Sequence, residues 1–85
     1  MKRVIVFTTE PCGFCRTAKA LLDARNIPYE EINLSKDPAG RAQLAHRTGM
    51  MTFPQVVIDG DPIGGFQELV RADRAGALEE LAEAA

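Results

Sequence analysis

Residues 2–22 read KRVIVFTTEPCGFCRTAKALL, and the fold class of this chain follows from them. It begins with a β-branched run at residues 2–8, passes through a short loop that contains Pro11, and continues into a stretch with helical periodicity. The apolar residues of that stretch share one helix face, and they are Phe14, Ala18, Leu21 and Leu22. The segment therefore predicts a buried strand, a turn, and a helix that ends near Asn26 and Pro28.

A second strand and a second helix follow. Residues 29–34, YEEINL, form a shorter and more polar run that favours a strand. Asp37 and Pro38 then supply an N-cap and a first-turn proline, so we expect a helix that closes near Thr48 and Gly49.

The last third of the chain changes its pattern. Residues 54–64 hold two short strand-like runs joined by Asp-Gly-Asp at 59–61, which predicts an antiparallel hairpin. Gly64 and Gly65 precede a final helical region. Gly76 interrupts it, after which the helical period of apolar residues resumes through residue 85.

The elements therefore follow the order β-α-β-α-β-β-α. A βαβ unit with a right-handed crossover, followed by a hairpin on the same sheet, predicts an α/β fold with a mixed four-stranded sheet and helices on both faces. We expect a single domain over residues 1–85, because this length supports one core. The loop after the first strand lies at the carboxyl edge of the sheet, where α/β proteins place their sites.

The composition excludes several kinds of partner. The formal net charge is -2 and no basic run exceeds Lys2-Arg3, so we expect neither a nucleic-acid nor a membrane partner. The longest apolar stretch, residues 4–7, is too short to span a bilayer, and no leader precedes it. We expect a cytoplasmic monomer.

Cys12 and Cys15 are the only cysteines of the chain. If the helix begins near Gly13, Cys12 stands at its N-terminus, where unpaired N–H groups and the helix dipole favour a thiolate. Cysteines of helix-terminal CxxC motifs titrate at roughly 3.5 to 7.5, against ~8.5 for a free cysteine. We therefore predict Cys12 as the nucleophile and leaving group, and Cys15, deeper in the first turn, as the resolving thiol.

Other uses of the two cysteines are less favoured. A disulfide between them would close too small a loop to stabilise the fold as a staple. A protein-only zinc site needs four ligands, and His46 has no partner at ligand spacing, so we predict no such metal site.

Two further features accompany the cysteines. The Phe53–Pro54 bond is a candidate for the cis form, which would let the Phe53 backbone pair with an extended thiol peptide. The alternative is that Pro54 only begins an edge strand. Gly64 and Gly65 before a helix would offer N–H groups to a carboxylate, although such a pair is also a common turn.

Together these features resemble glutaredoxins of the thioredoxin superfamily. The resemblance runs through FTTEPCGFCRTAKALL, TFPQVVIDG and IGGFQEL and covers nearly the whole chain. It implies the thioredoxin fold, a cis Pro54, glutathione as reductant, and reduction of protein disulfides and glutathione mixed disulfides. It also implies that Thr52 and Phe53 line a glutathione groove and that Gly65, Phe66 and Gln67 meet the γ-glutamyl end.

The chain departs from the family pattern between its cysteines. Dithiol glutaredoxins typically carry Pro-Tyr there, whereas Gly13-Phe14 resembles the monothiol branch, as does TFPQ at 52–55. This second resemblance implies an alternative, in which Cys12 from two subunits and two glutathiones hold a [2Fe–2S] cluster. Cys15 opposes it, because it can oxidise with Cys12 and remove the ligand.

The chain also departs from the family pattern around the groove. Thr9 and Met50 stand where the family usually has Lys and Arg, and Gln67 and Glu68 stand where it commonly has acidic residues that meet the γ-glutamyl amine. These replacements leave another hypothesis open, in which the same enzyme receives electrons from a flavoprotein reductase or a different small thiol.

Overall fold

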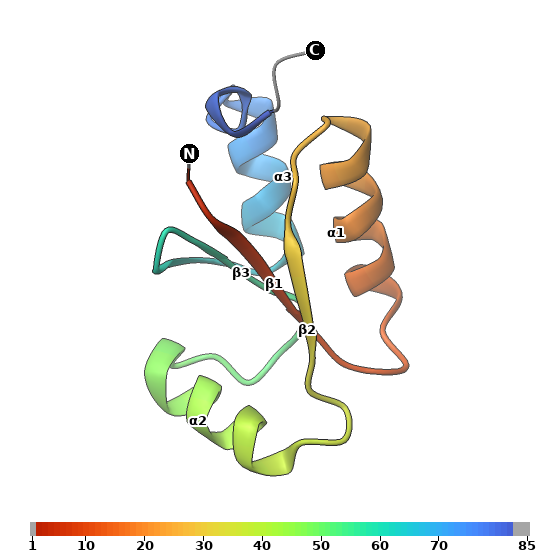
Figure 1. Cartoon of the computed structure of the whole chain (residues 1–85), viewed down its shortest axis with the longest axis vertical. Coiled ribbons are helices and arrows are strands. Elements are labelled where there is room, and N and C mark those ends of the chain that lie inside the picture. Colours follow the sequence, from red (N-terminus) through yellow and green to blue (C-terminus); the bar gives the residue numbers. More distant parts are fainter. Residues whose placement is uncertain (1, 83–85) are drawn as a thin grey trace.

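Four strands form one mixed sheet in the order β2-β1-β3-β4 (Figure 1). The computed structural model describes residues 2–82. Its strands are β1 Val4–Thr8, β2 Glu30–Asn33, β3 Gln55–Ile58 and β4 Asp61–Gly64. β1 pairs in parallel with β2 and antiparallel with β3, and β3 pairs antiparallel with β4. The predicted order of elements and the mixed four-stranded sheet are confirmed.

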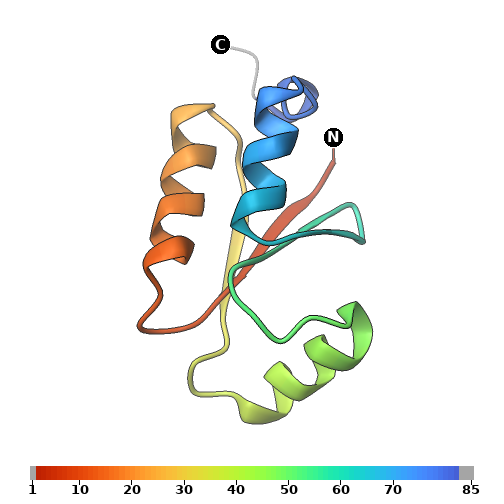
Figure 2. The same cartoon turned by 180° about the vertical axis from the view of Figure 1, so that it is seen from behind.

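Helices α1 (Gly13–Ala24) and α3 (Phe66–Arg74) cover one face of this sheet and contact each other (Figure 2). Alternate residues of the central strands point into this layer, among them Val6 and Val56, which are completely buried. Leu22 from α1 and Leu69 from α3 meet them and are also completely buried. Burial of each such side chain contributes roughly 1.5–3 kcal/mol, so this layer is the main hydrophobic core.

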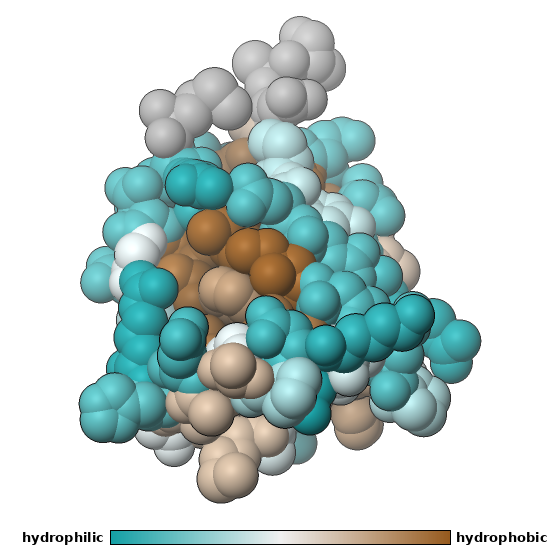
Figure 3. Space-filling view, turned by 60° about the horizontal axis from the view of Figure 1, so that its bottom comes forward, coloured by the Kyte–Doolittle hydropathy of each residue, from teal (hydrophilic) through white to brown (hydrophobic). Residues whose placement is uncertain are grey.

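Helix α2 (Pro38–Thr48) contacts the opposite face of the sheet at the start of β3. Gln55 is buried on that face, where its Oε1 accepts a hydrogen bond from the Thr48 hydroxyl at 2.8 Å. Ile5 and Phe7 of the same face stay partly exposed. Figure 3 shows apolar side chains gathered in a hollow there, ringed by hydrophilic ones. Helices thus lie on both sides of the sheet, as predicted, but they cover the two sides unequally.

The C-terminal region differs from its prediction. Gly76 has a φ of 78°, a left-handed conformation that ends the helical path after α3. Only a 3-10 helix, η1 (Glu79–Leu81), follows. The prediction that the helix resumes after Gly76 is therefore wrong for the described residues. Leu78 and Leu81 are nevertheless buried in the core, because a single tight turn brings both side chains inward. Ala85, which was part of that prediction, lies outside the described residues.

The helices are short. α1 is the longest helix in the described part of the chain, at 12 residues, whereas a transmembrane helix needs about 20. No helix formed by residues 2–82 is long and apolar enough to cross a membrane.

Candidate functional site

The two cysteines lie at the start of α1 and form a disulfide with each other. Cys12 is the N-cap residue, with an extended backbone, and its Sγ accepts a hydrogen bond from the Cys15 N–H at 3.1 Å. Cys12 is partly exposed, whereas Cys15 is only 2% exposed. One sulfur therefore faces solvent at a helix N-terminus, which favours its thiolate, and the other lies behind it in the protein.

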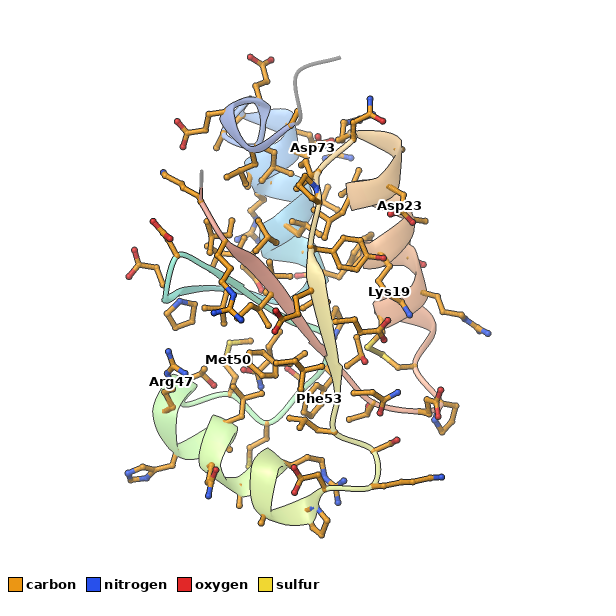
Figure 4. All side chains as sticks on the ribbon, viewed as in Figure 1. Lys19, Asp23, Arg47, Met50, Phe53 and Asp73 are labelled. Carbon is orange, nitrogen blue, oxygen red and sulfur yellow. A yellow bond between two sulfur atoms is a disulfide. The ribbon has the colours of Figure 1, made fainter. Side chains whose placement is uncertain are left out.

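The loop before β3 adds the second part of the site. The Phe53–Pro54 peptide bond is cis, as the resemblance to glutaredoxins implies, and Pro54 is buried while Thr52 is exposed. A second cis bond, Glu10–Pro11, lies directly before Cys12 and was not expected. Met50 and Phe53 lie on the segment that leads from α2 back to the sheet (Figure 4).

A groove of about 220 Å³ joins this loop to the start of α3. Its lining includes every residue that the resemblance assigned to a glutathione groove. The lining residues are Phe14, Met50, Thr52, Phe53, Pro54, Gly65, Phe66, Gln67 and Glu68. We call this cavity the groove.

Phe14 is a groove residue that the sequence analysis did not assign. Its ring stacks on Phe66 with centroids 5.7 Å apart and an interplanar angle of 28°, and its side chain connects α1 to α3. Phe14 is 64% exposed, so the pair forms an apolar wall open to solvent. Its place between the two cysteines was the available signal, but only the packing of the two helices shows its partner.

The groove holds little charge. Glu68 is the one ionisable residue among its lining residues in the described chain, and none of them is Lys or Arg. Glu68 Oε1 accepts a hydrogen bond from the Gly65 N–H at 2.7 Å. The Gly65 N–H, which the sequence analysis expected to be offered to a carboxylate, is therefore already bonded within the protein.

A second cavity, of about 550 Å³, contains both cysteines and shares no lining residue with the groove. It is lined by Thr8, Thr9, Glu10, Pro11, Cys12, Cys15, Arg16, Lys19, Glu31 and Asn33. We call it the cysteine cavity. The sequence alone does not predict this cavity, because its walls come from β1, α1, β2 and the loop between β1 and α1.

Two residues that line the cysteine cavity, Lys19 and Glu31, form a hydrogen-bonded ion pair. Lys19 Nζ donates to both carboxylate oxygens of Glu31 at 3.1 Å, and the Thr8 hydroxyl donates to Glu31 Oε2 at 2.8 Å. The hydrogen bond from Thr8 is the largest influence on Glu31, and together with Lys19 it lowers the pKa of that carboxyl, although partial burial opposes the shift. Glu31 is thus held as a carboxylate beside the two cysteines.

The described residues offer no metal site of their own. Across residues 2–82, no group of three or more His, Cys, Asp or Glu side chains could hold a metal ion. His46 is exposed on α2.

Comparison with known proteins adds independent evidence. The family model described as Glutaredoxin matches residues 4–63. The chain is 36% identical over 81 residues to Glutaredoxin 3 of Escherichia coli (strain K12). The aligned residues cover 95% of this chain and 98% of that protein. It is 37% identical over 84 residues to a glutaredoxin of Pseudomonas aeruginosa, covering 99% and 100%.

Solved structures agree with these relatives. A buckwheat glutaredoxin–glutathione complex matches with a TM-score of 0.85 and 32% identity, covering 94% of this chain and 76% of that one. The solution structure of a Brucella melitensis glutaredoxin matches with a TM-score of 0.81 and 37% identity, covering 93% and 86%.

Proposed function

The chain belongs to the glutaredoxin family and is a thiol-disulfide oxidoreductase, and on that basis we propose that Cys12 is its nucleophile and Cys15 its resolving thiol. One observation carries the assignment. The partly exposed Cys12 Sγ sits at the N-cap of α1 and accepts the Cys15 N–H, while Cys15 is buried directly behind it. The partly exposed Cys12 is accessible to a substrate, whereas Cys15 is buried next to it and bonds to its sulfur.

The proposed reaction has two substitutions at sulfur. The Cys12 thiolate attacks a substrate disulfide, forms a mixed disulfide, and releases one substrate sulfur as a thiolate. With a protein disulfide, Cys15 then attacks Cys12 Sγ, releases the second substrate thiol, and leaves the Cys12–Cys15 disulfide. The substrate gains the two electrons that the dithiol loses. With a glutathione mixed disulfide, a second glutathione replaces Cys15 in the final step.

The groove is the proposed place for glutathione. Glutaredoxins use glutathione, and the buckwheat neighbour is a glutathione complex. We propose that the peptide lies along Thr52, Phe53 and Pro54, with its γ-glutamyl end toward Gly65, Phe66 and Gln67. The shared cavity of these residues supports the proposal. Because no Lys or Arg lines the groove in the described chain, we expect the two carboxylates of glutathione to be bound weakly.

The electron donor can be tested directly. We expect glutathione to reduce the Cys12–Cys15 disulfide of the oxidised protein, measured by thiol alkylation and mass spectrometry. The parallel reaction contains NADPH and a thioredoxin-reductase system in place of glutathione. Reduction in the reductase reaction but not in the glutathione reaction would reject glutathione as donor.

We propose the cytoplasm as the compartment, because small-molecule and protein thiol systems keep cysteines reduced there.

Adding a cation to the groove should strengthen glutathione binding. Met50 lines the groove, so we expect Met50→Arg to lower the KM for glutathione about 5-fold with little change in kcat, since a half-exposed charged hydrogen bond contributes about 1 kcal/mol. The matched control is Met51→Arg, because Met51 is 84% exposed and lies outside the groove. Equal KM values for the two variants would place glutathione elsewhere.

A [2Fe–2S] cluster does not fit the described chain by itself. Cys12 is the one accessible cysteine, and its sulfur forms a disulfide with Cys15. The other ligands would have to come from a second subunit and from glutathione. Because Cys15 can oxidise with Cys12 and remove that ligand, we expect anaerobic reconstitution with iron, sulfide and glutathione to leave a colourless monomer by absorption spectroscopy and size-exclusion chromatography. A coloured dimer would reverse this conclusion.

A further inference from the structure

The cysteine cavity is lined by a lysine, Lys19, whose ammonium is held in place by hydrogen bonds. Lys19 follows Cys15 by one helical turn, so the two side chains leave α1 on the same face. Its ammonium is fixed by both oxygens of Glu31 at 3.1 Å. Figure 4 shows Lys19 next to the yellow disulfide in that view, and both line the same cavity.

Glu31, which accepts hydrogen bonds from this ammonium, is also hydrogen-bonded to a buried residue. Glu31 accepts the Thr8 hydroxyl at 2.8 Å, and Thr8 is 1% exposed on β1. The side chains of Lys19 and Glu31 are 27% and 33% exposed. By contrast, the Lys2–Glu80 and Arg3–Glu30 ion pairs have side chains that are 49% exposed or more. Since water screens charges less where a pair is partly buried, Lys19 is better placed than a surface lysine to act on a neighbouring charge.

The resolving step needs a negative charge on the sulfur of Cys15, which is buried. Cys15 is 2% exposed, and burial disfavours the charged thiolate form of a cysteine. The attacking sulfur must nevertheless be a thiolate. The N-terminus of α1 serves Cys12, because the Cys15 N–H itself donates to Cys12 Sγ. A different group is needed to stabilise negative charge on Cys15.

We propose that Lys19 stabilises the thiolate of Cys15 during the resolving step and that Glu31 and Thr8 hold its ammonium in the cysteine cavity for this purpose. The inference rests on the proposed function, in which Cys15 resolves the mixed disulfide. The remaining charged residues of the cavity are Glu10 and Arg16, both exposed, so solvent screens them more than it screens Lys19.

The step balances as a simple exchange. Cys15 loses its proton to solvent, and its sulfur attacks Cys12 Sγ. The Cys12–Cys15 bond forms while the bond from Cys12 to the substrate sulfur breaks. The substrate sulfur leaves with the electron pair and takes a proton from solvent. The ammonium of Lys19 changes neither its charge nor its bonds.

The test measures a ratio of two activities. One is reduction of a protein disulfide, which uses Cys15, and the other is reduction of a glutathione mixed disulfide, which does not. For Lys19→Gln we expect this ratio to fall roughly 5- to 10-fold at pH 7, as a shift of up to one pKa unit would produce. We also expect the pH profile of protein-disulfide reduction to move to higher pH, and Lys19→Arg to restore most of the ratio.

Lys2→Gln is the matched control. It removes the same charge from the exposed ion pair with Glu80. Neither Lys2 nor Glu80 lines the cysteine cavity, so the ratio and the pH profile should stay unchanged. Lys19→Met, which keeps the apolar stem, serves as a second variant if Lys19→Gln unfolds, as judged by circular dichroism.

Two outcomes would overturn the inference. The first is a wild-type ratio and pH profile in Lys19→Gln. The second is a slower resolving step in Glu31→Gln but not in Lys19→Gln, since this would make Glu31 the proton acceptor instead. Failure of the proposed function looks different, because Cys15→Ser would then reduce protein disulfides as fast as the unmodified protein.

Discussion

Cys12→Ser is expected to abolish thiol-disulfide exchange, with a loss of roughly 10³-fold or more, because a serine hydroxyl is not ionised at neutral pH and cannot replace a thiolate as nucleophile. The fold should survive. Serine is a preferred N-cap residue, so its hydroxyl can accept the Cys15 N–H that Cys12 Sγ accepts in the structure. The measurement is reduction of a glutathione mixed disulfide, with thermal unfolding followed by circular dichroism.

The interpretation depends on that retained fold. A Cys12→Ser protein with an unchanged unfolding midpoint and no activity assigns the loss to the sulfur alone. Activity within tenfold of the unmodified protein would remove Cys12 from the mechanism and, with it, the proposed roles of Cys15 and Lys19.

Cys15→Ser should separate the two reactions. Reduction of protein disulfides is expected to fall at least about 100-fold, because no buried thiol remains to displace the substrate from Cys12. Reduction of glutathione mixed disulfides should stay within a few-fold of the unmodified protein, since a second glutathione completes that reaction. Mass spectrometry should detect the trapped mixed disulfide between Cys12 and the substrate.

A second variant protects this experiment from a folding artefact. Cys15 is 2% exposed, and a buried hydroxyl without a partner costs roughly 1–3 kcal/mol. Cys15→Ala avoids that cost and should give the same separation of activities. If both variants reduce protein disulfides at the original rate without a trapped intermediate, Cys15 is not the resolving thiol.

The bounds of α2 and the hairpin turn could be predicted from the sequence because they depend on contacts between residues close in the chain. The bounds of α2 follow from Asp37, whose side chain accepts the Gly40 N–H, from Pro38 in the first turn, and from Gly49 in a left-handed conformation. The hairpin turn at Asp59 and Gly60 has positive φ at both residues. These features involve neighbours in the chain, so residue type alone predicts them.

The same reasoning failed where packing decides. The apolar period after Gly76 predicted a helix, yet the chain forms only a 3-10 turn, and Leu78 and Leu81 still reach the core. Periodicity reports which side chains are to be buried. It does not report whether a helix or a single turn buries them, because both can place two leucines against the same core.

The order of elements, the mixed sheet and the helix that begins after Cys12 follow from the residues alone, whereas the cis bond before Pro54 follows from the resemblance to glutaredoxins. The side chains that line the groove and the cysteine cavity become known only from the packing of distant segments. Phe14 meets Phe66 across two helices, and Glu31 meets Lys19 and Thr8 across 12 and 23 residues of sequence. Backbone conformation depends on adjacent residues, whereas the charges around a thiol depend on strand pairing and helix packing, which bring distant residues together.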